Sequence, residues 1–493
     1  EISMEEALWK SADKLRGAIE PAEYKHVVLS LFFLKFASDK FVKCREKIIK
    51  THGEKYADMK PFYTQENVFY LPEESRWSYI IENAKQDDIA LKIDTALFTI
   101  EKNNPALKGA LPDNYYSRLH FDTAKLASLL DEINRINTED EENDIIGRVY
   151  EYFLSKFALA EGKGKGEFYT PKCIVNLIAE MLEPYDGILY DPCCGSGGMF
   201  VQSAKFIQAH SGSRGAIAVY GQEANADTWK MAKINMAIRG IDADFGAYQA
   251  DTFTNDLHPT LKADFVLANP PFNYHPWNQE KLTDDVRWKY GLPPAGNANY
   301  AWIQHMIHHL APHGKIGLVL ANGALSTQSS GEGEIRKRII QDDLIEGIVA
   351  LPTQLFYSVT IPVTLWFITK GKKQAGKTLF IDARKMGYMV DRKHRDFTEA
   401  DIAKIADTFE AFQNGTLEDV KGFCAVATLQ DIEKQDFILT PGRYVGIEEQ
   451  EDDGEPFEEK MSRLTSELSE LFAKSHELEA EIKERLGVIG FEL

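Results

Sequence analysis

The chain has 493 residues, of which 44% are hydrophobic and 11% aromatic, and its formal net charge is −20. This composition excludes an intrinsically disordered chain, and no apolar run approaches the ~20 residues that cross a bilayer, so no membrane association is expected. The length exceeds what one core supports, which favours two or three domains. The negative charge repels nucleic acid over most of the surface, so any binding to DNA must be local or depend on a partner.

Residues 1–160 show helical periodicity. Apolar residues recur at helical spacing in the first stretch, at Leu8, Ala12, Leu15 and Ile19. The next stretch, 22–49, has a wide apolar face that predicts a buried helix. The glycine- and lysine-rich segment 161–167 predicts a domain boundary. We therefore expect a helical N-terminal domain over residues 1–160.

Between residues 161 and 454, short apolar runs alternate with helical stretches. This alternation predicts a doubly wound, Rossmann-like α/β domain. The expected strands are 187–191, 216–223, 263–270, 315–321, 345–351 and 362–369. The expected helices lie near 198–210, 225–239, 299–311 and 331–342.

The last segment, 455–493, has apolar residues at alternating steps of three and four, the spacing of a coiled-coil seam. These residues are Met461, Leu464, Leu468, Leu471, Leu478 and Ile482. We expect a helix whose seam is shared with another chain. The alternative is a lone amphipathic helix that lies on its own domain.

The cysteines are scattered, and none forms a C-x-x-C pair. This pattern is typical of reduced thiols in the cytoplasm and argues against structural zinc. The five residues are Cys44, Cys173, Cys193, Cys194 and Cys424. A cytoplasmic protein is therefore expected.

The segment DPCCGSGG, at 191–198, follows an expected strand and precedes an expected helix. Its glycines let the backbone turn tightly and approach a ligand closely, and the amides of the helix N-terminus can donate to that ligand. The segment is neither a dinucleotide-binding nor a P-loop motif. A tight connection without a ligand therefore remains the alternative.

Two acidic residues follow in register. Glu223 ends the next expected strand, where acids of nucleotide-binding sheets accept hydrogen bonds from ribose hydroxyls. Asp251 ends a further weak strand and can accept from an adenine amino group. A turn or helix-capping aspartate is the alternative for Asp251.

The sequence Asn269-Pro270-Pro271-Phe272 directly follows another expected strand. The Asn269 side-chain oxygen and the Pro270 carbonyl can accept both hydrogens of one exocyclic amine, which frees the lone pair of that nitrogen. Phe272 offers a flat face on which an extruded base can stack. The alternative is a proline-rich turn with a capping asparagine.

Three other features carry weaker expectations. His305 and His309 lie four residues apart on an expected helix, but H-E-x-x-H is absent, so no metal is expected. The long connection 273–298 is expected to order on DNA. Phe356 and Tyr357 are either a second stacking platform or core aromatics.

The motifs at 191–198, 221–223, 250–253 and 269–272, in this order, resemble those of amino-methyltransferases that use S-adenosylmethionine. Upstream, GEFYTP at 166–171 resembles the extra cofactor motif of gamma-class DNA adenine methyltransferases. More closely, the chain resembles the modification subunit of type I restriction-modification systems, in the stretches LWKSADKLRG, EYKHVVLSLFFLKFASD and WNQEKLTDDVRWKYGLPPAGNANYAWIQHMIHHL. The resemblance covers nearly the whole chain. Cys193 is a mild departure, because the family has alanine there.

The resemblance implies a site for S-adenosylmethionine and for adenine. The methionine side of the cofactor would be lined by Glu167, Phe168, Tyr169, Thr170, Pro171 and Lys172. The turn beside it would comprise Asp191, Gly195, Ser196 and Gly197, with Glu223 at the ribose and Asp251 by the cofactor's adenine. The catalytic motif would be Asn269, Pro270, Pro271 and Phe272.

The implied activity is methylation of adenine N6 in a specific duplex DNA sequence. The implied partners are a DNA-specificity subunit docked on the helix of 455–493 and a restriction subunit, with two copies of this chain per complex. Three alternatives stay open: a protein glutamine N5-methyltransferase, a cytosine N4 DNA methyltransferase, and a binding-only subunit that has lost activity.

Overall fold

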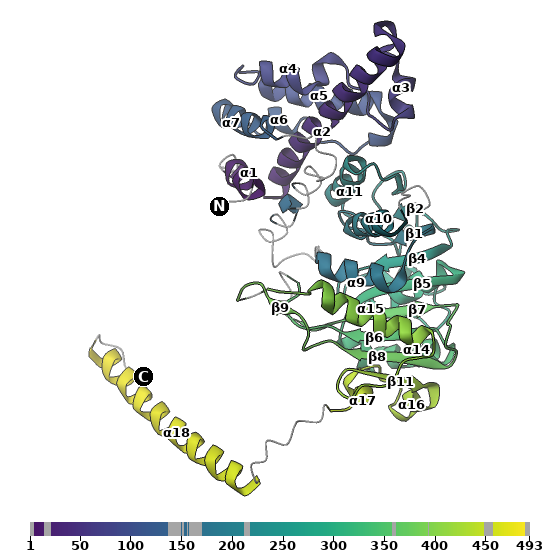
Figure 1. Ribbon diagram of the computed structural model, residues 1–493, viewed down its shortest axis with the longest axis vertical. Coiled ribbons are helices and arrows are strands. Elements are labelled where there is room, and N and C mark those ends of the chain that lie inside the picture. Colours follow the sequence, from purple (N-terminus) through teal and green to yellow (C-terminus); the bar gives the residue numbers. More distant parts are fainter. Residues whose placement is uncertain are drawn as a thin grey trace. The chain divides into compact units, whose positions relative to one another are not determined.

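The computed structural model describes residues 4–13, 21–136, 149, 152–154, 156, 170–211, 217–356, 361–392, 394–447 and 457–488 (Figure 1). It forms two compact units, residues 1–446 and 447–493. The domain boundaries expected after residues 160 and 454 lie outside the described residues. Within the described ranges, every helix is too short or too polar to cross a bilayer.

The N-terminal region is helical and is built around the long helix α2 (Pro21–His52). The wide apolar face expected for this stretch is buried, with Val27, Phe32 and Phe41 inaccessible to solvent. The other helices of this region are α1 (Met4–Asp13), α3 (Lys60–Gln65), α4 (Trp77–Glu82), α5 (Ile89–Asn103), α6 (Tyr115–Arg118) and α7 (Thr123–Asn134). The core formed by these helices extends to α11 (Ala226–Ile238) of the following domain, which attaches the two regions to each other.

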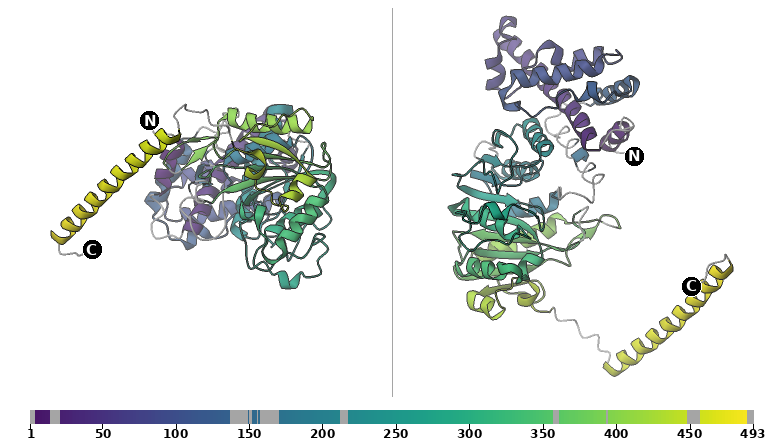
Figure 2. Two further views of the ribbon diagram at one scale, coloured as in Figure 1. Left: turned by 90° about the horizontal axis from the view of Figure 1, so that it is seen from below. Right: turned by 180° about the vertical axis from the view of Figure 1, so that it is seen from behind.

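The second region contains a nine-stranded mixed sheet in the order β11-β8-β6-β7-β5-β4-β1-β2-β3 (Figure 2). All six expected strands are present: β1 (Gly187–Asp191), β2 (Ile217–Gly221), β4 (Ala263–Ala268), β5 (Leu310–Ala321), β6 (Ile345–Ala350) and β7 (Val363–Thr369). Strands β8 (Lys377–Asp382) and β11 (Cys424–Thr428) were not expected, and the expectation of a weak strand that ends at Asp251 is wrong, because the strand found in this part of the chain is the two-residue β3 (Ala243–Asp244), which ends before that residue. Strand β7 runs antiparallel between β5 and β6, and β11 runs antiparallel to β8.

Two apolar layers cover the two faces of this sheet. One contains α9 (Lys172–Leu182), α10 (Gly198–Ser211), α11 and α15 (Glu399–Gln413), and the other contains α12 (Asn299–His308), α14 (Glu332–Gln341) and α16 (Leu429–Lys434). The four expected helices correspond to α10, α11, α12 and α14. Because β1, β2 and β4 are parallel, their carboxyl ends lie at one edge of the sheet, where α/β sheets bind ligands.

Smaller elements complete the first unit: α13 (Gly323–Ser326), α17 (Gly442–Val445) and the two-stranded hairpin of β9 (Tyr388–Met389) and β10 (Arg395–Asp396). The second unit contains the helix α18 (Phe457–Val488). Its six expected seam residues are 43% to 63% exposed. Within this unit, these side chains form an apolar stripe that the helix itself does not cover.

Candidate active site

The glycine-rich turn begins at the carboxyl end of β1. Asp191 is 2% exposed, and its Oδ1 accepts a hydrogen bond from the Cys193 amide at 3.0 Å. Gly195 and Gly197 adopt left-handed backbone angles, φ 54° and 85°, which favour glycine. A Cβ on Gly197 would lie 2.8 Å from Cε of Met236. The turn therefore depends on glycine both for its backbone conformation and for its packing.

Burial raises the pKa of Asp191 to about 7, and the nearby Glu223 carboxylate adds to this shift, while hydrogen bonds from Cys193 oppose it. An adjacent cation favours the charged form of a buried carboxylate and lowers its pKa again. The sulfonium and ammonium groups of S-adenosylmethionine are cations, so the environment of Asp191 fits that cofactor.

The two cysteines of the turn carry thiols whose pKa lies well above the usual range. Burial is the main cause for both Cys193 and Cys194, and the negative charges of Asp191 and Glu223 add to it. Cys194 is 5% exposed, and its amide donates to the Gln222 carbonyl. These cysteines are therefore held as neutral thiols within the turn.

Glu223 joins this turn to the start of α11. Its Oε2 accepts from the Gly195 amide at 3.1 Å, and its Oε1 accepts from the Asn225 amide at 2.8 Å. A carboxylate oxygen can accept more than one hydrogen bond, so these contacts are compatible with a role at ribose hydroxyls. The expected ribose role stays a prediction, and the contact with Gly195 adds a bracing role that the sequence did not show.

Asp251 organises its own turn. Its Oδ1 accepts from the amides of Phe253 and Thr254 and from the Thr254 hydroxyl, at 2.8 to 3.1 Å. This geometry is that of the turn aspartate considered as the alternative from the sequence. An additional contact with the cofactor's adenine stays a prediction, and Oδ2 is the atom that could make it.

Asn269 follows β4 and is oriented by a residue far away in the chain. Its Nδ2 donates to the Thr170 hydroxyl oxygen at 2.9 Å. Its Oδ1 is buried and has no hydrogen-bond partner in the described structure. A buried acceptor without a partner costs free energy, about 1–3 kcal/mol. It therefore marks a position where a bound donor would be stabilising.

Beyond Asn269, the ring of Phe272 meets that of Phe356. Their centroids are 6.1 Å apart at an interplanar angle of 77°, an edge-to-face pair. Phe272 is partly exposed, whereas Phe356 is 5% exposed and belongs to the core. Phe356 thus supports Phe272 as a core aromatic, which is the second of the two roles considered for it; Tyr357 lies outside the described residues.

The upstream cofactor motif is described only in part. Glu167, Phe168 and Tyr169 lie outside the described residues. Pro171 precedes α9 as its N-cap, and Lys172 is the exposed first residue of that helix. Thr170 is placed against Asn269 by its hydrogen bond, so this motif and the motif of residues 269–272 meet.

The connection 273–298 differs from its expectation. Within the described structure, Trp277 is fully buried and Trp288 is 8% exposed, and both belong to the core beside β4. Arg287 is 6% exposed and donates to the carbonyls of Thr252 and Phe253 at 3.0 and 2.6 Å. The expectation of a segment that orders only on DNA is wrong for these side chains, because they pack with the chain itself.

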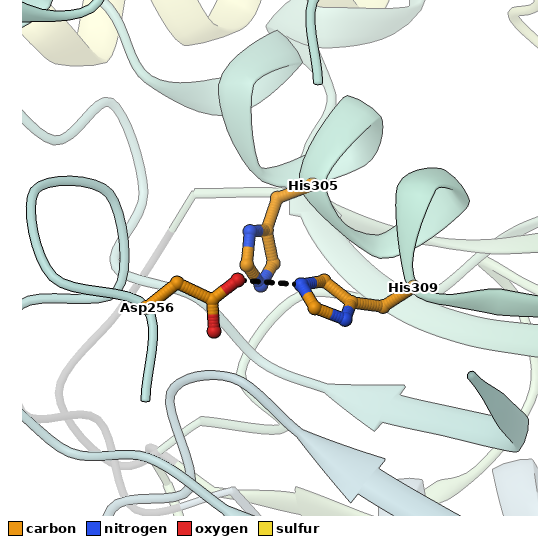
Figure 3. A group of neighbouring side chains, drawn as sticks. All are labelled: Asp256, His305 and His309. Atoms are coloured by element: carbon orange, nitrogen blue, oxygen red, sulfur yellow. Dashed lines mark hydrogen bonds and ion pairs between the residues drawn. The ribbon is translucent and has the colours of Figure 1, made fainter. Parts of the chain in front are cut away.

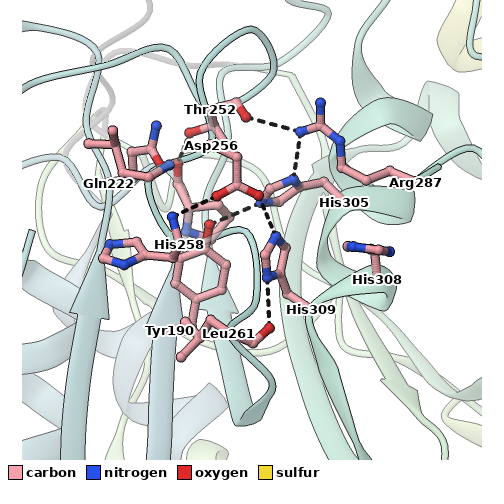
Figure 4. Close-up of polar contacts among 12 residues, drawn as sticks. Tyr190, Gln222, Thr252, Asp256, His258, Leu261, Arg287, His305, His308 and His309 are labelled. Carbon is pink, nitrogen blue, oxygen red and sulfur yellow. Dashed lines mark hydrogen bonds and ion pairs between the residues drawn. The ribbon is translucent and has the colours of Figure 1, made fainter. Parts of the chain in front are cut away.

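Sequence reasoning missed a buried polar network centred on Arg287 (Figure 4). The guanidinium is paired with the Asp285 carboxylate through Nε and Nη2, each at 2.8 Å, and its Nη1 lies 3.1 Å from His305 Nδ1. The Thr252 hydroxyl donates to the Pro192 carbonyl of the glycine-rich turn at 2.5 Å. The network therefore connects the segment after the catalytic motif with both loops expected to hold the cofactor.

Asp256, His305 and His309 lie together in this network, with possible metal-ligating atoms within 4.8 Å of one another (Figure 3). Arg287 can only donate, so His305 Nδ1 accepts and its Nε2 carries the hydrogen toward the Tyr190 oxygen, 3.0 Å away. Both ring nitrogens of His309 face oxygen atoms, at 2.7 Å from Asp256 and 2.9 Å from the Leu261 carbonyl. We interpret Asp256, His305 and His309 as part of a hydrogen-bonded network that holds the loops at this edge of the sheet.

Comparison with known proteins identifies the class. A profile of the family "N-6 DNA Methylase" matches residues 141–453, and a profile of the "HsdM N-terminal domain" matches residues 4–133. The chain therefore belongs to the N-6 DNA methylase family and is an adenine-specific DNA methyltransferase. The family implies S-adenosylmethionine as the cofactor.

Individual relatives identify the class of this chain more specifically than the family profiles do. The chain is 53% identical to the type I restriction enzyme HindI methylase subunit of Haemophilus influenzae, over 86% of this chain and 100% of that protein. It is 40% identical to the MjaIX methylase subunit of Methanocaldococcus jannaschii, over 99% of this chain and 91% of that protein. This kinship identifies it as a methylase subunit of the type I restriction-modification class.

A solved structure shows the same fold. It is the type I restriction-modification system methyltransferase subunit from Streptococcus thermophilus, with a TM-score of 0.76 and 24% identity, covering 90% of this chain and 99% of that one. The expected Rossmann-like methyltransferase domain with a helical N-terminal region is confirmed.

Proposed function

We propose that this chain methylates N6 of an adenine that has left the DNA duplex and is held by the motif Asn269–Phe272. The observation that supports this proposal is the buried Oδ1 of Asn269, which has no hydrogen-bond partner among the described residues. The tether of its Nδ2 to Thr170 fixes the orientation of the amide and thereby the position of this acceptor. An exocyclic amine is a donor that would satisfy it.

The motif would prepare the amine in two ways. Asn269 Oδ1 and the Pro270 carbonyl accept its two hydrogens and favour a tetrahedral nitrogen whose lone pair is free to attack. Phe272, supported from behind by Phe356, provides the stacking surface for the base. Since neither group is a nucleophile or a base, the chain contributes position and polarity.

S-adenosylmethionine supplies an activated methyl group when it is bound. The residues that would hold it are Asp191, Gly195, Ser196 and Gly197 of the turn, with Glu223 at the ribose, Asp251 near the adenine, and Glu167 to Lys172 at the methionine end. Buried Asp191, with its raised pKa, and the left-handed backbone of the turn at Gly195 and Gly197 support this assignment.

The exposed stripe of α18 supports a docking role toward a sequence-reading subunit. Its apolar residues are 43% to 63% exposed, which is costly unless a partner helix covers them. The net charge of −20 also makes unaided DNA binding weak. We propose a complex with a specificity subunit that presents duplex DNA, a restriction subunit, and two copies of this chain.

Tritium transfer from labelled S-adenosylmethionine tests the proposal, with DNA and protein acceptors assayed side by side and modified bases identified by sequencing. Asn269→Ala should keep cofactor affinity and lose ~10²–10³-fold in rate, as for other positioned polar groups. Label in protein would indicate a glutamine methyltransferase, and label at cytosine N4 the other alternative. Cofactor binding without transfer to any acceptor would indicate a binding-only subunit.

A further inference from the structure

The β9–β10 hairpin carries three consecutive exposed apolar side chains. Tyr388, Met389 and Val390 are 48%, 42% and 59% exposed. The hairpin is hydrogen-bonded at its end, because the Val390 amide donates to the His394 carbonyl at 2.8 Å. Its strands pair Met389 with Arg395. An ordered element that holds adjacent apolar side chains in water is typical of an interaction surface.

The base of this hairpin is connected to one wall of the proposed adenine site. The Arg395 amide donates to the Gln354 carbonyl at 2.9 Å. Two residues after Gln354, the ring of Phe356 meets that of Phe272. A displacement of the hairpin would therefore shift the segment that carries Phe356, whose ring contacts that of Phe272.

The base also lies beside the segment that holds Asn269. Burial raises the pKa of the Cys173 thiol, in the first turn of α9, to about 12, and the neighbouring Asp396 carboxylate adds to this shift. Three residues before Cys173 is Thr170, which holds Asn269. Figure 1 shows β9 beside α9 and α15. The hairpin is thus connected both to the segment that leads to Phe356 and to the start of α9, and its three apolar side chains are exposed.

The charge of this segment differs from that of the chain. Residues 382–396 contain five Lys or Arg and three Asp, a net of 5 − 3 = +2, in a chain whose net charge is −20. Arg384 pairs with Asp382 at 2.6 Å, and Arg384, Lys385 and Arg392 are exposed. Positive charge beside apolar side chains complements a nucleic acid, because the charged side chains can contact the phosphates and the apolar side chains can contact the bases.

We propose that this hairpin contacts duplex DNA at the target adenine, with Tyr388, Met389 and Val390 against the base step that the extruded adenine leaves. This inference rests on the proposed function. Apolar side chains inserted at a base step replace lost stacking, and an extruded base must leave such a gap. The nearby Arg and Lys side chains would hold the flanking phosphates.

The test uses the full chain together with its sequence-reading partner and two duplexes that carry the mapped target. In one duplex the target adenine is paired with thymine, and in the other it faces an abasic site and is already unpaired. The tip variant is Tyr388→Ser/Met389→Ser/Val390→Ser. The matched control, Leu91→Ser/Phe98→Ser, changes apolar side chains that are 57% and 61% exposed on α5.

We expect the tip variant to methylate the paired duplex at least ten-fold more slowly than the wild type and to recover most of the rate on the abasic duplex. Cofactor affinity, assembly and the control variant should be unchanged. Arg392→Glu should weaken duplex binding several-fold, and more so at low salt. Equal rates of variant and wild type on the paired duplex would overturn the proposal, as would equal losses on both duplexes.

Loss of assembly with the partner in the tip variant would instead identify a protein interface and also overturn it. Failure of the proposed function is distinguished by the wild type, which would then transfer no methyl group to either duplex. In that case, 2-aminopurine fluorescence at the target position still decides the role of the hairpin, since it reports extrusion of the base without chemistry. An unchanged fluorescence signal in the tip variant would refute the inference.

Discussion

Asn269 is held by Thr170, a residue 99 positions earlier in the chain, through a single hydrogen bond of 2.9 Å from its Nδ2 to the threonine hydroxyl. This contact decides which end of the amide faces the site, and Oδ1 stays buried without a hydrogen-bond partner in the part of the chain that the structure describes. The motif before α9 and the motif after β4 are thus joined by this hydrogen bond.

Thr170→Val should therefore reduce turnover, because it removes the hydroxyl that accepts from Asn269 Nδ2. The loss of one neutral hydrogen bond, about 1 kcal/mol, corresponds to a roughly five-fold lower kcat, and any change in KM for the cofactor would report the expected position of Thr170 at its methionine end. Thr170→Ser keeps the hydroxyl and should restore the rate. Steady-state methyl transfer measures both. A valine variant with wild-type kcat would show that the tether is dispensable.

The raised pKa of Asp191 predicts a pH dependence of cofactor affinity. The folded chain binds a proton at this carboxyl up to about pH 7, above the ordinary value of 3.8. Protonation therefore stabilises the folded chain relative to the unfolded one, and this stabilisation is lost as pH rises through 7. A bound cation needs the charged carboxylate, so affinity should rise with pH and level off above 7.

Calorimetry between pH 5.5 and 8.5 would show this as up to about ten-fold weaker binding for each unit below pH 7. Asp191→Asn should bind the cofactor more weakly and with a flat profile over the same range. A wild-type profile that is equally flat would mean that this carboxyl does not change charge on binding.

Arg287 is expected to stabilise both the fold and the loop of residues 251–253. Arg287→Ala removes the guanidinium that pairs with the Asp285 carboxylate and donates to two buried carbonyls, and breaking a buried pair costs about 3–5 kcal/mol. Arg287→Lys keeps the charge but loses the bidentate geometry, so an intermediate loss is expected. Urea unfolding gives the free energy, and calorimetry gives the cofactor affinity. Wild-type stability of the alanine variant would contradict this role.

Deletion of residues 455–493 should abolish capture of the sequence-reading subunit and leave cofactor affinity intact, because the cofactor motifs all precede residue 273. Leu468→Glu should have the same effect from a single exposed position of the stripe. Glu467→Gln, next to it on the polar face, is the control. A pull-down with methyl transfer distinguishes them. Full assembly of the truncated chain would show that the apolar stripe of α18 is not the docking surface for this subunit.

Much of the sheet could be predicted because its central strands are continuous apolar runs between turns. The gathering of Asp191, Glu223 and Asn269 at one edge followed from the same pattern, since parallel strands end together. Helix α15 was not among the expected helices, although its sequence carries a local signal, the capping box of Thr398 and Asp401.

Other features had no local signal. Arg287 stands in a polar, charged stretch that is typical of an exposed loop, and it is buried only because Asp285 and carbonyls from residues 252 and 253 surround it. The bond between Thr170 and Asn269 joins two motifs that periodicity treats separately. Such contacts arise from the tertiary fold, so spacing along the chain does not indicate them.

The two neutral thiols of the glycine-rich turn affect whether the cofactor can methylate and so inactivate the protein that binds it. An alkylating cofactor held beside cysteines threatens to methylate them, and the attacking species in such a reaction is the thiolate. Burial and the neighbouring carboxylates raise the pKa of Cys193 and Cys194 and keep the thiolate scarce. Prolonged incubation with S-adenosylmethionine should therefore leave both sulfur atoms unmethylated by mass spectrometry. The same surroundings that prepare Asp191 for a cation thus protect the protein from its own reagent.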